Sequence, residues 1–273
     1  MNTTSNANPS FDSSRQSAIR YDAFLGPMFF EPYAIEVAER IPFRAVSVAL
    51  ELAAGTGRVT RHIRKRIPDS AHLIASDINE DMLTVAREKL AHLNIEWQTI
   101  DAQQLPFSDN SVDLIVCCFG YMSVPDKPKA FAEAYRVLRH EGLFLFTTWD
   151  KLEHNAASYI SRMAAKKYCE EIMAASHNLA TSMHDEAGIR VLLEDAGFLK
   201  IAIEKVQKNS VCATASEAAI GLVQNGPLFE AIKRQNPAWV DAIINTTEAE
   251  LSEKFGAAPM VAPISAVISQ AWK

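Results

Sequence analysis

The sequence lacks the features that mark several classes of protein. Cysteine is scarce: the chain has four in 273 residues and no Cys-x-x-Cys spacing, so neither a zinc site nor a disulfide framework is predicted. No apolar run reaches the roughly 18 residues that a membrane-spanning helix needs. The start of the chain is polar, without the apolar segment of a signal peptide. We therefore expect a cytoplasmic protein with no membrane span and no bound metal.

Basic charge is also in short supply. The formal net charge is −6 at pH 7, and there is no long basic run. Nucleic acid is therefore not expected as the main partner. A short basic cluster, Arg61, Arg64, Lys65 and Arg66, fits a solvated helix face better than a binding patch. Apolar residues make up 48% of the chain, which is ample for the core of one large α/β domain with insertions.

The most informative stretch runs from Ser47 to Thr60. A short apolar run ends in Glu51, and a turn that carries Gly55 and Gly57 then leads into a helix-compatible segment. This pattern predicts a strand, a tight turn and the start of a helix. The glycines leave room for a ligand against the backbone, and the helix directs its free N–H groups toward that space.

Several known ligand-binding turns share part of this pattern. The dinucleotide fingerprint G-x-G-x-x-G would place its third glycine at Thr60, and the P-loop needs a Gly-Lys-Ser/Thr that does not follow. What remains is Glu-x-Ala-x-Gly-x-Gly, from Glu51 to Gly57. It resembles motif I of the class I methyltransferases that depend on S-adenosylmethionine (SAM), with Ala53 where many members carry a first glycine. A tight turn without a ligand stays open as the alternative.

The resemblance continues after the glycine turn. Asp77 ends a second predicted strand about 20 residues later, which is the spacing of the ribose-binding acid in related nucleotide folds. In the family this acid binds both ribose hydroxyls, and Ile78 and Met82 would then lie beside the adenine. Asp77 or Asn79 is also a candidate N-cap for the next helix, and the cap and ligand roles can coexist.

A third predicted strand ends in the turn Asp101-Ala102-Gln103. This turn resembles the adenine-binding turn of the family, where a carboxylate accepts from the adenine amino group and the next backbone N–H donates to the ring. A carboxylate paired with one N–H is complementary to an adenine edge. The resemblance thus places these three residues at the cofactor, and a plain turn is the alternative.

An unbroken apolar run ending at Cys118 predicts a fourth strand that is buried on both faces. Its exit and a later Trp-Asp-x-Leu, which begins at Trp149, are similar to those of small-molecule methyltransferases such as the ubiquinone and menaquinone C-methyltransferases. Cys118 stands where that group has glutamine, a position that faces cofactor and acceptor. The resemblance implies Cys118 as a cofactor contact and Phe119, Tyr121 and Trp149 as acceptor contacts.

The segment 21–33 is dense in aromatic residues. It either packs on the core or caps the cofactor and the acceptor. Its similarity to the N-terminal segment of small-molecule methyltransferases favours the cap, with Tyr21 toward the cofactor and Phe29 toward the acceptor.

The predicted fold is α/β: a Rossmann-like class I methyltransferase fold with a seven-stranded, mostly parallel sheet, an antiparallel last strand and helical lid insertions. We expect strand five over 143–148, strand six over 200–206 and the last strand over 263–271. One domain over 1–273 should comprise a flexible arm (1–18), an N-terminal cap (19–40), a SAM-binding core (41–150), a helical lid insertion (151–185) and the C-terminal part of the sheet (186–273), with a helical insertion over 212–258.

The expected activity is transfer of a methyl group from SAM to a small-molecule O-, C- or N-nucleophile. A SAM-binding protein without catalysis remains an alternative, and an NAD-dependent oxidoreductase is disfavoured because Thr60 breaks its fingerprint. If a base assists, His154 is the first candidate, because it follows strand five closely, with Asp150 to orient it. His184 and Tyr121 are further candidates. Whether the protein forms a homodimer stays open.

Overall fold

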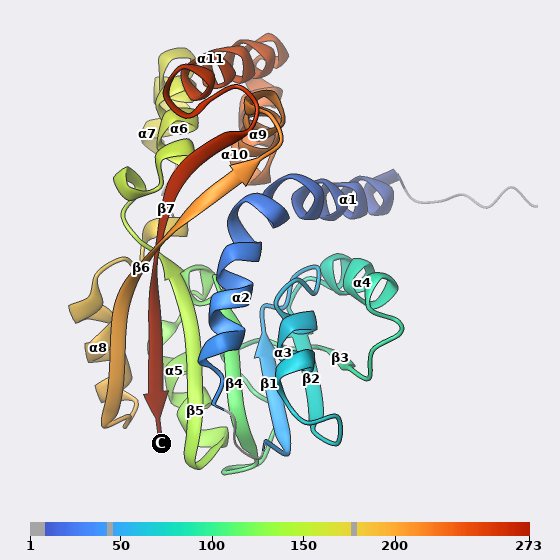
Figure 1. The fold of residues 1–273 in the computed structure, drawn as a ribbon, viewed down its shortest axis with the longest axis vertical. Helices are drawn as coiled ribbons and strands as arrows, with labels where there is room; N and C mark the ends of the chain where they lie inside the picture. The colour runs from blue at the N-terminus through green and yellow to red at the C-terminus, as the bar shows by residue number, and fades with distance from the viewer. Residues whose placement is uncertain (1–8, 43–45, 176–178) are drawn as a thin grey trace, which may run out of the picture.

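The computed structural model describes residues 9–42, 46–175 and 179–273. Seven strands form one sheet in the order β3-β2-β1-β4-β5-β7-β6 (Figure 1). All pairings from β3 to β5 are parallel, whereas β7 is antiparallel to both of its neighbours, so the predicted sheet is confirmed. The strands are β1 (Val48–Leu52), β2 (His72–Asp77), β3 (Glu96–Thr99), β4 (Val112–Cys118), β5 (Leu138–Trp149), β6 (Lys200–Cys212) and β7 (Met260–Trp272).

The parallel register brings the carboxyl ends of β1, β2, β4 and β5 to one edge of the sheet. Glu51 pairs with Ala75 on one side and with Val116 on the other. Cys118 pairs with Thr147 near the end of β5. In sheets of this kind a ligand binds beyond the carboxyl ends, where the strand order reverses, which here lies between β1 and β4.

Both faces of the sheet are covered because successive side chains on each strand point to opposite faces. On β5, Leu143 and Leu145 belong to one buried cluster, and Phe144 and Phe146 to the other. The first cluster includes side chains of helices α2 (Glu31–Arg40) and α3 (Thr60–Arg66), and the second those of α5 (Lys127–Val137) and α8 (Glu186–Asp195). Helix α4 (Glu80–Lys89) begins at Asn79, whose side chain accepts from the Asp81 N–H, so Asn79 rather than Asp77 is the N-cap.

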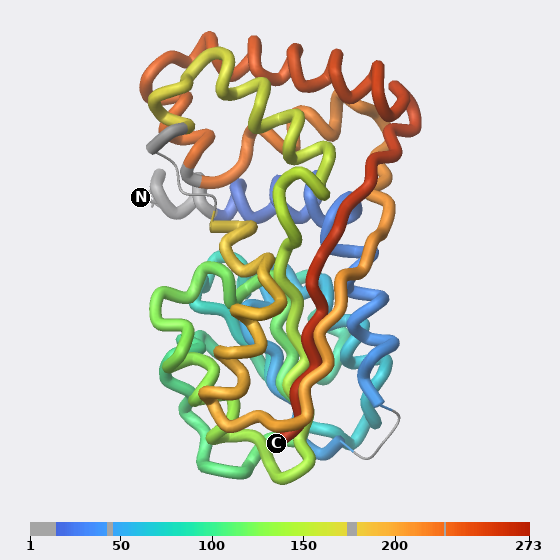
Figure 2. The backbone as a smooth tube through the Cα atoms, turned by 90° about the vertical axis from the view of Figure 1, so that its left-hand side faces the viewer, coloured from blue at the N-terminus to red at the C-terminus, as the bar shows by residue number. Residues whose placement is uncertain are grey.

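Two insertions form a helical lobe beyond the carboxyl ends of the sheet (Figures 1 and 2). One follows β5 and the other joins β6 to β7, and the helices of the second are interrupted near Gly226-Pro227 and Asn236-Pro237. Their helices are α6 (Ala156–Tyr168), α7 (Glu170–Ala175), α9 (Ala215–Val223), α10 (Gly226–Gln235) and α11 (Pro237–Phe255). Residues 176–178, which belong to the expected helical lid insertion over 151–185, lie outside the described residues.

Strands β5, β6 and β7 are longer than the sequence predicted. β5 begins at Leu138 rather than at residue 143, and its register with β4 shifts within this extension. β6 and β7 pair from Lys200–Trp272 to Cys212–Met260, and their far ends run as a two-stranded ribbon into the helical lobe (Figure 2). The apolar pattern misses this extension because β6 is an edge strand with mostly exposed or half-exposed residues.

The predicted flexible arm, 1–18, is wrong for residues 9–18, because they belong to helix α1 (Pro9–Arg20). Ala18 is buried, and Arg15 forms an ion pair of 2.7 Å with Glu88 of α4. The polar composition of this segment does not indicate that it docks on α4. Residues 1–8 lie outside the described part of the chain.

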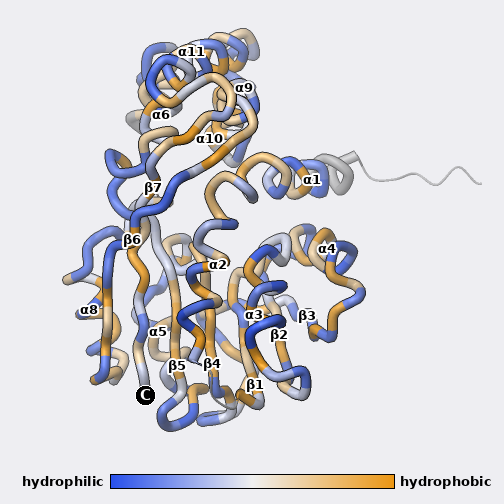
Figure 3. Tube along the Cα trace, viewed as in Figure 1, coloured by the Kyte–Doolittle hydropathy of each residue, from blue (hydrophilic) through white to orange (hydrophobic). Residues whose placement is uncertain are grey.

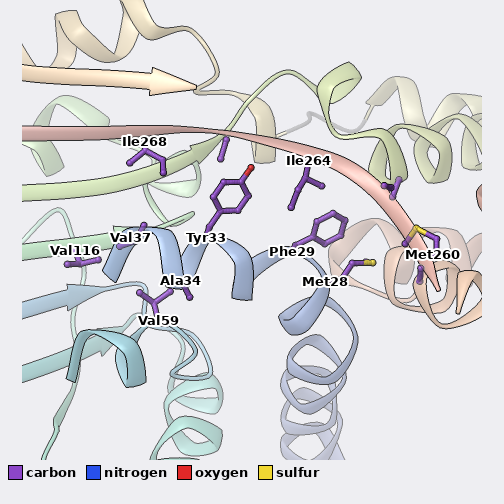
Figure 4. Close-up of a cluster of buried hydrophobic side chains, with 14 of the residues drawn as sticks. Met28, Phe29, Tyr33, Ala34, Val37, Val59, Val116, Met260, Ile264 and Ile268 are labelled. Atoms are coloured by element: carbon purple, nitrogen blue, oxygen red, sulfur yellow. The ribbon is translucent and has the colours of Figure 1, made fainter. Parts of the chain in front are cut away.

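The predicted cap consists of a π-helix, η1 (Tyr21–Phe30), followed directly by α2. Figure 3 shows η1 as a hydrophobic segment between the sheet and the helical lobe. In Figure 4, Phe29 and Tyr33 lie beside Ile264 of β7. The Tyr33 hydroxyl donates to the Val206 carbonyl of β6 at 2.8 Å, so the cap is fixed to the strands that lead to the lobe. None of the helices in the described ranges is long and apolar enough to cross a membrane.

Candidate functional site

The glycine turn forms a cradle at the carboxyl edge of the sheet. Gly55 and Gly57 both have left-handed backbone angles, with φ of +56° and +78°. A Cβ on Gly57 would lie 2.8 Å from Leu90 Cδ1, so this glycine permits close packing of the turn on α4. A Cβ on Gly55 would meet no atom within 4 Å. Gly55 therefore borders open space, as a ligand that lies against the backbone requires.

Ala53 and the exit of β4 form the other wall of this cradle. Ala53 has φ of +54°, a conformation that costs an L-residue roughly 1–2 kcal/mol. A Cβ on Gly120 would lie 2.4 Å from the Ala53 Cβ and 2.7 Å from Cys117 Sγ. The β4 exit thus packs directly on the turn. Burial raises the pKa of the Cys118 thiol well above its usual value, so the thiol stays protonated and neutral.

Asp77 ties the end of β2 to the glycine turn. Its carboxylate accepts from the Gly55 N–H at 2.8 Å and from the Asn79 N–H at 2.9 Å. Burial raises the pKa of this carboxyl above its usual value, although both N–H groups favour the charged form. The adjacent Ile78 is 70% exposed, an unusual state for a large apolar side chain beside a buried strand end. This pair of residues fits the ribose and adenine contacts that the resemblance implies.

Glu51, near the end of β1, has a buried carboxyl group that is only partly hydrogen-bonded. It is 1% exposed, and its Oε2 atom has no hydrogen-bond partner among the described residues. Burial, together with the nearby Asp77 carboxylate, raises its pKa to about 8. An unpaired buried carboxyl oxygen at the edge of an open cradle can form a hydrogen bond with a polar group of a bound ligand. The space at Gly55, the Glu51 oxygen and exposed Ile78 therefore fit a bound SAM.

The turn after β3 is folded around its aspartate. The Asp101 carboxylate accepts from the Gln103 backbone N–H at 2.9 Å and from the Gln103 side-chain amide at 3.0 Å. The bond from the Gln103 backbone is the main reason that the pKa of Asp101 lies below its usual value. Ala102 packs partly on the second buried cluster. Met82, by contrast, lines a separate hollow of about 920 Å³ between α1, α4 and α10–α11.

The cap is fastened to the glycine turn by charge. Asp22 accepts from the Thr56 hydroxyl at 2.6 Å, from Arg58 at 3.0 Å and from Lys89 at 2.6 Å. These bonds hold η1 beside the turn. Burial and the nearby Asp77 and Asp22 carboxylates raise the pKa of Tyr21, so its hydroxyl remains a donor at neutral pH.

An aromatic stack lies where β4 and β5 end. The rings of Phe119 and Trp149 are stacked with centroids 3.9 Å apart and planes inclined by 14°. Phe30 and Tyr33 meet Phe119 with their rings tilted steeply, at 5.6 and 5.5 Å. Phe119 has φ of +59°, an outlier for a bulky residue, and strained backbone of this kind concentrates at functional sites.

The stack is part of the wall of a cavity of about 410 Å³ between the sheet edge, η1 and the helical lobe. Its lining is mainly apolar and comes from η1, the ends of β4 and β5, α6 and the lobe helices. The lining residues include Tyr21, Leu25, Phe29, Phe30, Phe119, Met122, Trp149, Leu152, Leu222, Leu228, Ile232 and Ile243. Phe29, Phe119 and Trp149, three of the four predicted acceptor contacts, therefore border one cavity, together with Tyr21.

Tyr121, the fourth predicted acceptor contact, does not line this cavity. It is fully buried against Phe131 and Phe144, and its hydroxyl donates to the Ala130 carbonyl at 3.3 Å. Its place in one-turn helix η2 (Tyr121–Ser123) directs it into the second cluster, so we correct its assignment from acceptor contact, or candidate base, to core residue.

His154 and Asp150 form the predicted pair, but outside the cavity lining. His154 Nδ1 lies 2.7 Å from Asp150 Oδ2. Buried Asp150 also accepts from Lys205 of β6 at 2.9 Å and from the Ser265 hydroxyl of β7 at 3.0 Å. Burial opposes the charge, but the bonds from His154 and Lys205 outweigh it and hold the pKa of Asp150 well below its usual value. The other candidate base, His184, has Nδ1 2.8 Å from the Thr181 carbonyl and is also not part of the lining.

The structure adds cavity residues that sequence reasoning missed, among them four polar residues at the start of the first insertion. Ser158, Ser161 and Arg162 of α6 line the cavity with Asn155. The Asn155 amide donates to the Ser265 carbonyl at 3.2 Å and accepts from the Ser265 N–H at 3.1 Å, which fixes the start of α6 to β7. The spacing of Ser158, Ser161 and Arg162 at i, i+3 and i+4 predicts a polar helix face. The local sequence does not indicate that this face borders a cavity.

Replacing Ala53 by glycine should stabilise the protein. Glycine removes the steric cost of the left-handed conformation but adds entropy to the unfolded chain, so we expect a net gain of a few tenths to about 1 kcal/mol. Ala54→Gly is the matched control and should destabilise, because Ala54 is buried and has no positive φ. Urea unfolding of both variants measures the difference, and a loss of stability in Ala53→Gly would contradict the strain.

The unfolding free energy should depend on pH through Glu51. Between the ordinary value of 4.5 and about 8, folded Glu51 holds a proton that the unfolded chain has lost, so stability falls as pH rises through this window. At pH 8 the cost relative to pH 5 should reach at most about 4 kcal/mol. Glu51→Gln should lose this part of the pH dependence. If the unfolding free energies of the two proteins, measured in urea, changed in parallel from pH 5 to 8, the raised pKa of Glu51 would be refuted.

Comparisons with known proteins agree with the geometry. A methyltransferase domain family matches residues 49–142. The chain is 36% identical over 148 residues to the ubiquinone/menaquinone biosynthesis C-methyltransferase UbiE of Pseudoalteromonas translucida, an alignment that spans 52% of this chain and only 59% of that protein. To the protein of the same name from Shewanella halifaxensis it is 31% identical over 208 residues, or 67% of this chain and 80% of the relative.

Solved structures share the fold at low identity. The YcgJ protein of Bacillus subtilis aligns with a TM-score of 0.56 and 18% identity, over 89% of this chain and 98% of that one. Phosphoethanolamine N-methyltransferase 2 of Haemonchus contortus, in complex with phosphomonomethylethanolamine and S-adenosylhomocysteine, aligns with a TM-score of 0.60 and 17% identity. The alignment covers 95% of this chain and 57% of that chain. The chain therefore belongs to the class I SAM-dependent methyltransferases, and its cofactor is S-adenosylmethionine.

Proposed function

We propose that this methyltransferase acts on a small, flat, phenol- or quinone-like acceptor that binds in the aromatic cavity. The observation that carries the proposal is the cavity of about 410 Å³ whose wall includes the Phe119–Trp149 stack, at the strand end that packs on the glycine turn. Stacked and tilted rings favour a planar partner. The names of the relatives, which are C-methyltransferases of quinone biosynthesis, support an acceptor of this class.

In this proposal the chain works as one methyltransferase domain, and the segment 41–150 holds SAM. The cofactor would contact Tyr21, the turn from Glu51 to Gly57, Asp77 with Ile78, the turn 101–103 and Cys118. Met82 is kept as an adenine contact only if the hollow that it lines adjoins the bound adenine. Bound SAM supplies a sulfonium methyl group that is open to in-line displacement.

The contribution of the protein is mainly to position the acceptor. Phe29, Phe30, Phe119 and Trp149 would hold the ring of the acceptor. Tyr21, protonated at neutral pH, can donate a hydrogen bond at the boundary of the two sites. Since neither His154 nor His184 lines the cavity, we propose that the acceptor proton leaves to water and that His154 is not the base.

We further propose a cytoplasmic protein whose main partner is the small molecule rather than nucleic acid. A homodimer and the absence of a resident metal remain predictions. Within the described residues, no three His, Cys, Asp or Glu side chains are grouped as metal ligands would be.

Removing the Asp77 carboxylate should weaken SAM binding. Asp77→Ala should lose about 1.5–3 kcal/mol of binding free energy, the range for hydrogen bonds to a charged group. Asp77→Asn should fold better than Asp77→Ala, because the amide oxygen can still accept from the Gly55 N–H. Exposed Asp69→Ala is the control and should bind SAM normally. Calorimetric titration that finds unchanged affinity in both Asp77 variants would remove this residue from the site.

A panel of phenols, hydroquinones and amines tests the function directly. With methyl-labelled SAM, mass gain should appear for planar phenols or hydroquinones and not for aliphatic amines. Trp149→Ala should lower the rate for accepted rings while SAM affinity stays within about threefold. Methylation of aliphatic amines alone would contradict the proposed acceptor class.

The same assay decides the role of His154. His154→Ala should keep a rate and a pH profile from 6 to 9 close to those of the unchanged protein, because the imidazole faces Asp150 outside the cavity lining. A rate loss of about a hundredfold or more, with a changed pH profile, would restore His154 as a general base.

The helical lobe should act as a lid. Its α6 and α9–α11 helices supply much of the cavity lining, so movement of these helices would open or close the cavity. Hydrogen exchange in 156–175 and 215–255 should slow when S-adenosylhomocysteine and an accepted ring are added together. Exchange that is the same with and without ligands would show a lobe that does not close.

A further inference from the structure

The buried carboxyl of Glu51 is the part of the cofactor site whose charge the proposed function does not explain. Glu51 is 1% exposed, and its Oε2 atom has no hydrogen-bond partner among the described residues. It lies on β1, between β2 and β4, near the edge of the sheet where the glycine turn begins. A buried carboxyl without a full set of partners is more stable neutral than charged. The folded protein without ligand therefore keeps a proton on Glu51 at neutral pH.

The groups that face Glu51 do not offer it an opposite charge. Burial is the main reason that its pKa rises to about 8, the Thr60 hydroxyl of α3 opposes this rise, and the Asp77 carboxylate of β2 adds to it. From β4, Cys117 and Cys118 supply two thiols whose pKa values are raised by burial, so both stay neutral at pH 7. Asp77 differs from Glu51, because two backbone N–H groups already hold its charge. The proton of this pair of carboxyls therefore resides on Glu51.

The strand order places Glu51 between the two ends of the cofactor. Asp77 and exposed Ile78 fit the ribose and the adenine beyond β2. The Phe119–Trp149 stack, at the ends of β4 and β5, borders the acceptor cavity. The sulfonium of SAM joins the ribose to the methyl group that the acceptor receives. With the ribose at β2 and the acceptor at β4 and β5, the sulfonium lies over the carboxyl end of β1, which carries Glu51.

SAM and its product differ by one positive charge at this point. The sulfur of SAM is a sulfonium, whereas that of S-adenosylhomocysteine is a neutral thioether. A unit charge about 8 Å from a carboxylate, at an effective dielectric constant of about 20, lowers the proton affinity of the carboxylate by at least about tenfold. The sulfonium therefore favours ionised Glu51 without touching it, and the thioether does not.

We infer that Glu51 distinguishes SAM from S-adenosylhomocysteine by charge: it releases its proton to solvent when SAM binds and keeps it when S-adenosylhomocysteine binds. The inference rests on the proposed placement of SAM and does not depend on the class of acceptor. When the methyl group leaves, the sulfur keeps the electron pair of the broken bond and becomes neutral. Glu51 then takes a proton back from solvent, because the opposite charge beside its carboxylate is gone. Glu51 is thus a residue that favours the exchange of product for fresh cofactor.

The release of a proton fixes the sign of the pH dependence. A ligand whose binding releases a proton binds more tightly as pH rises. Between pH 6 and 7.5, the affinity for SAM relative to that for S-adenosylhomocysteine should therefore rise by about threefold or more in the unchanged protein. Glu51→Gln has no proton to release at this position, so it should lose this rise.

Calorimetric titration in buffers of different ionisation enthalpy, such as phosphate, imidazole and Tris, counts the protons directly. At pH 7, binding of SAM to the unchanged protein should release roughly half a proton per site or more. S-adenosylhomocysteine should release less than about a quarter of that amount. Glu51→Gln should bind SAM without this release. Glu39→Gln is the matched control and should keep the full release, because Glu39 is an exposed carboxyl of α2.

Equal proton release with SAM and S-adenosylhomocysteine would overturn the inference, as would binding of SAM with no release. Both results come from the unchanged protein, so they decide the matter even if Glu51→Gln folds poorly. Release that persists in Glu51→Gln would assign the proton to another group and also overturn the inference. Since the readout is a proton count rather than methyl transfer, these outcomes are separate from failure of the proposed function, which would appear as an absence of mass gain in the acceptor panel.

Discussion

The hydrogen bond from the Gly55 N–H to the Asp77 carboxylate is the contact on which the cofactor site depends. It joins the turn after β1 to the end of β2, and with it the ligand-facing Gly55 is fixed beside Asp77 and Ile78. The β4 exit is fixed to the same turn through the contact of Gly120 with Ala53. Three strand ends thus meet at one short loop. The loop includes the strained Ala53 and the buried Glu51, whose Oε2 atom has no hydrogen-bond partner among the described residues. Both features reduce the stability of the fold at the position where a bound ligand can provide compensating contacts.

A second junction positions the acceptor cavity. Buried Asp150 connects β5 to Lys205 of β6 and Ser265 of β7, and Asn155 repeats the connection to Ser265 through the backbone. These contacts lie where the β6–β7 ribbon leaves the sheet for the helical lobe. Asp150, predicted as the partner of a catalytic histidine, is thereby explained as a structural anchor. Burial opposes the charge of Asp150, but the hydrogen bonds from His154, Lys205 and Ser265 hold its pKa low, and removing Asp150 would leave Lys205 without this buried partner.

The sequence was sufficient where the signal is local. Motif I, the Asp77 strand end and the turn at Asp101 are short patterns whose chemistry determines their conformation. The sheet order follows from the alternation of strands and helices once motif I is recognised. What failed depends on distant contacts: helix α1 is held by α4, the far half of β6 is stabilised by pairing with β7, and Tyr121 enters the core because η2 turns it there. The polar face of α6, formed by Ser158, Ser161 and Arg162, can be recognised in the sequence. The direction in which it points depends on the contact between Asn155 and Ser265, which are 110 residues apart.

The difference between local sequence patterns and contacts between distant residues also explains why the cofactor is easier to identify than the acceptor. The cofactor contacts lie on the parallel core, where the spacing between strand and turn is fixed by the fold. The acceptor cavity is closed by η1, α6 and the α9–α11 insertion, segments whose packing can change without disturbing the glycine turn. Cys118 and Phe119 stand at the border between the two. A strained Phe119, stacked on Trp149, presents a flat wall to a ligand that enters. Acceptor choice in this protein is therefore a property of how the lobe is docked, and variants at the Asn155–Ser265 clasp should alter acceptor affinity before they alter SAM affinity.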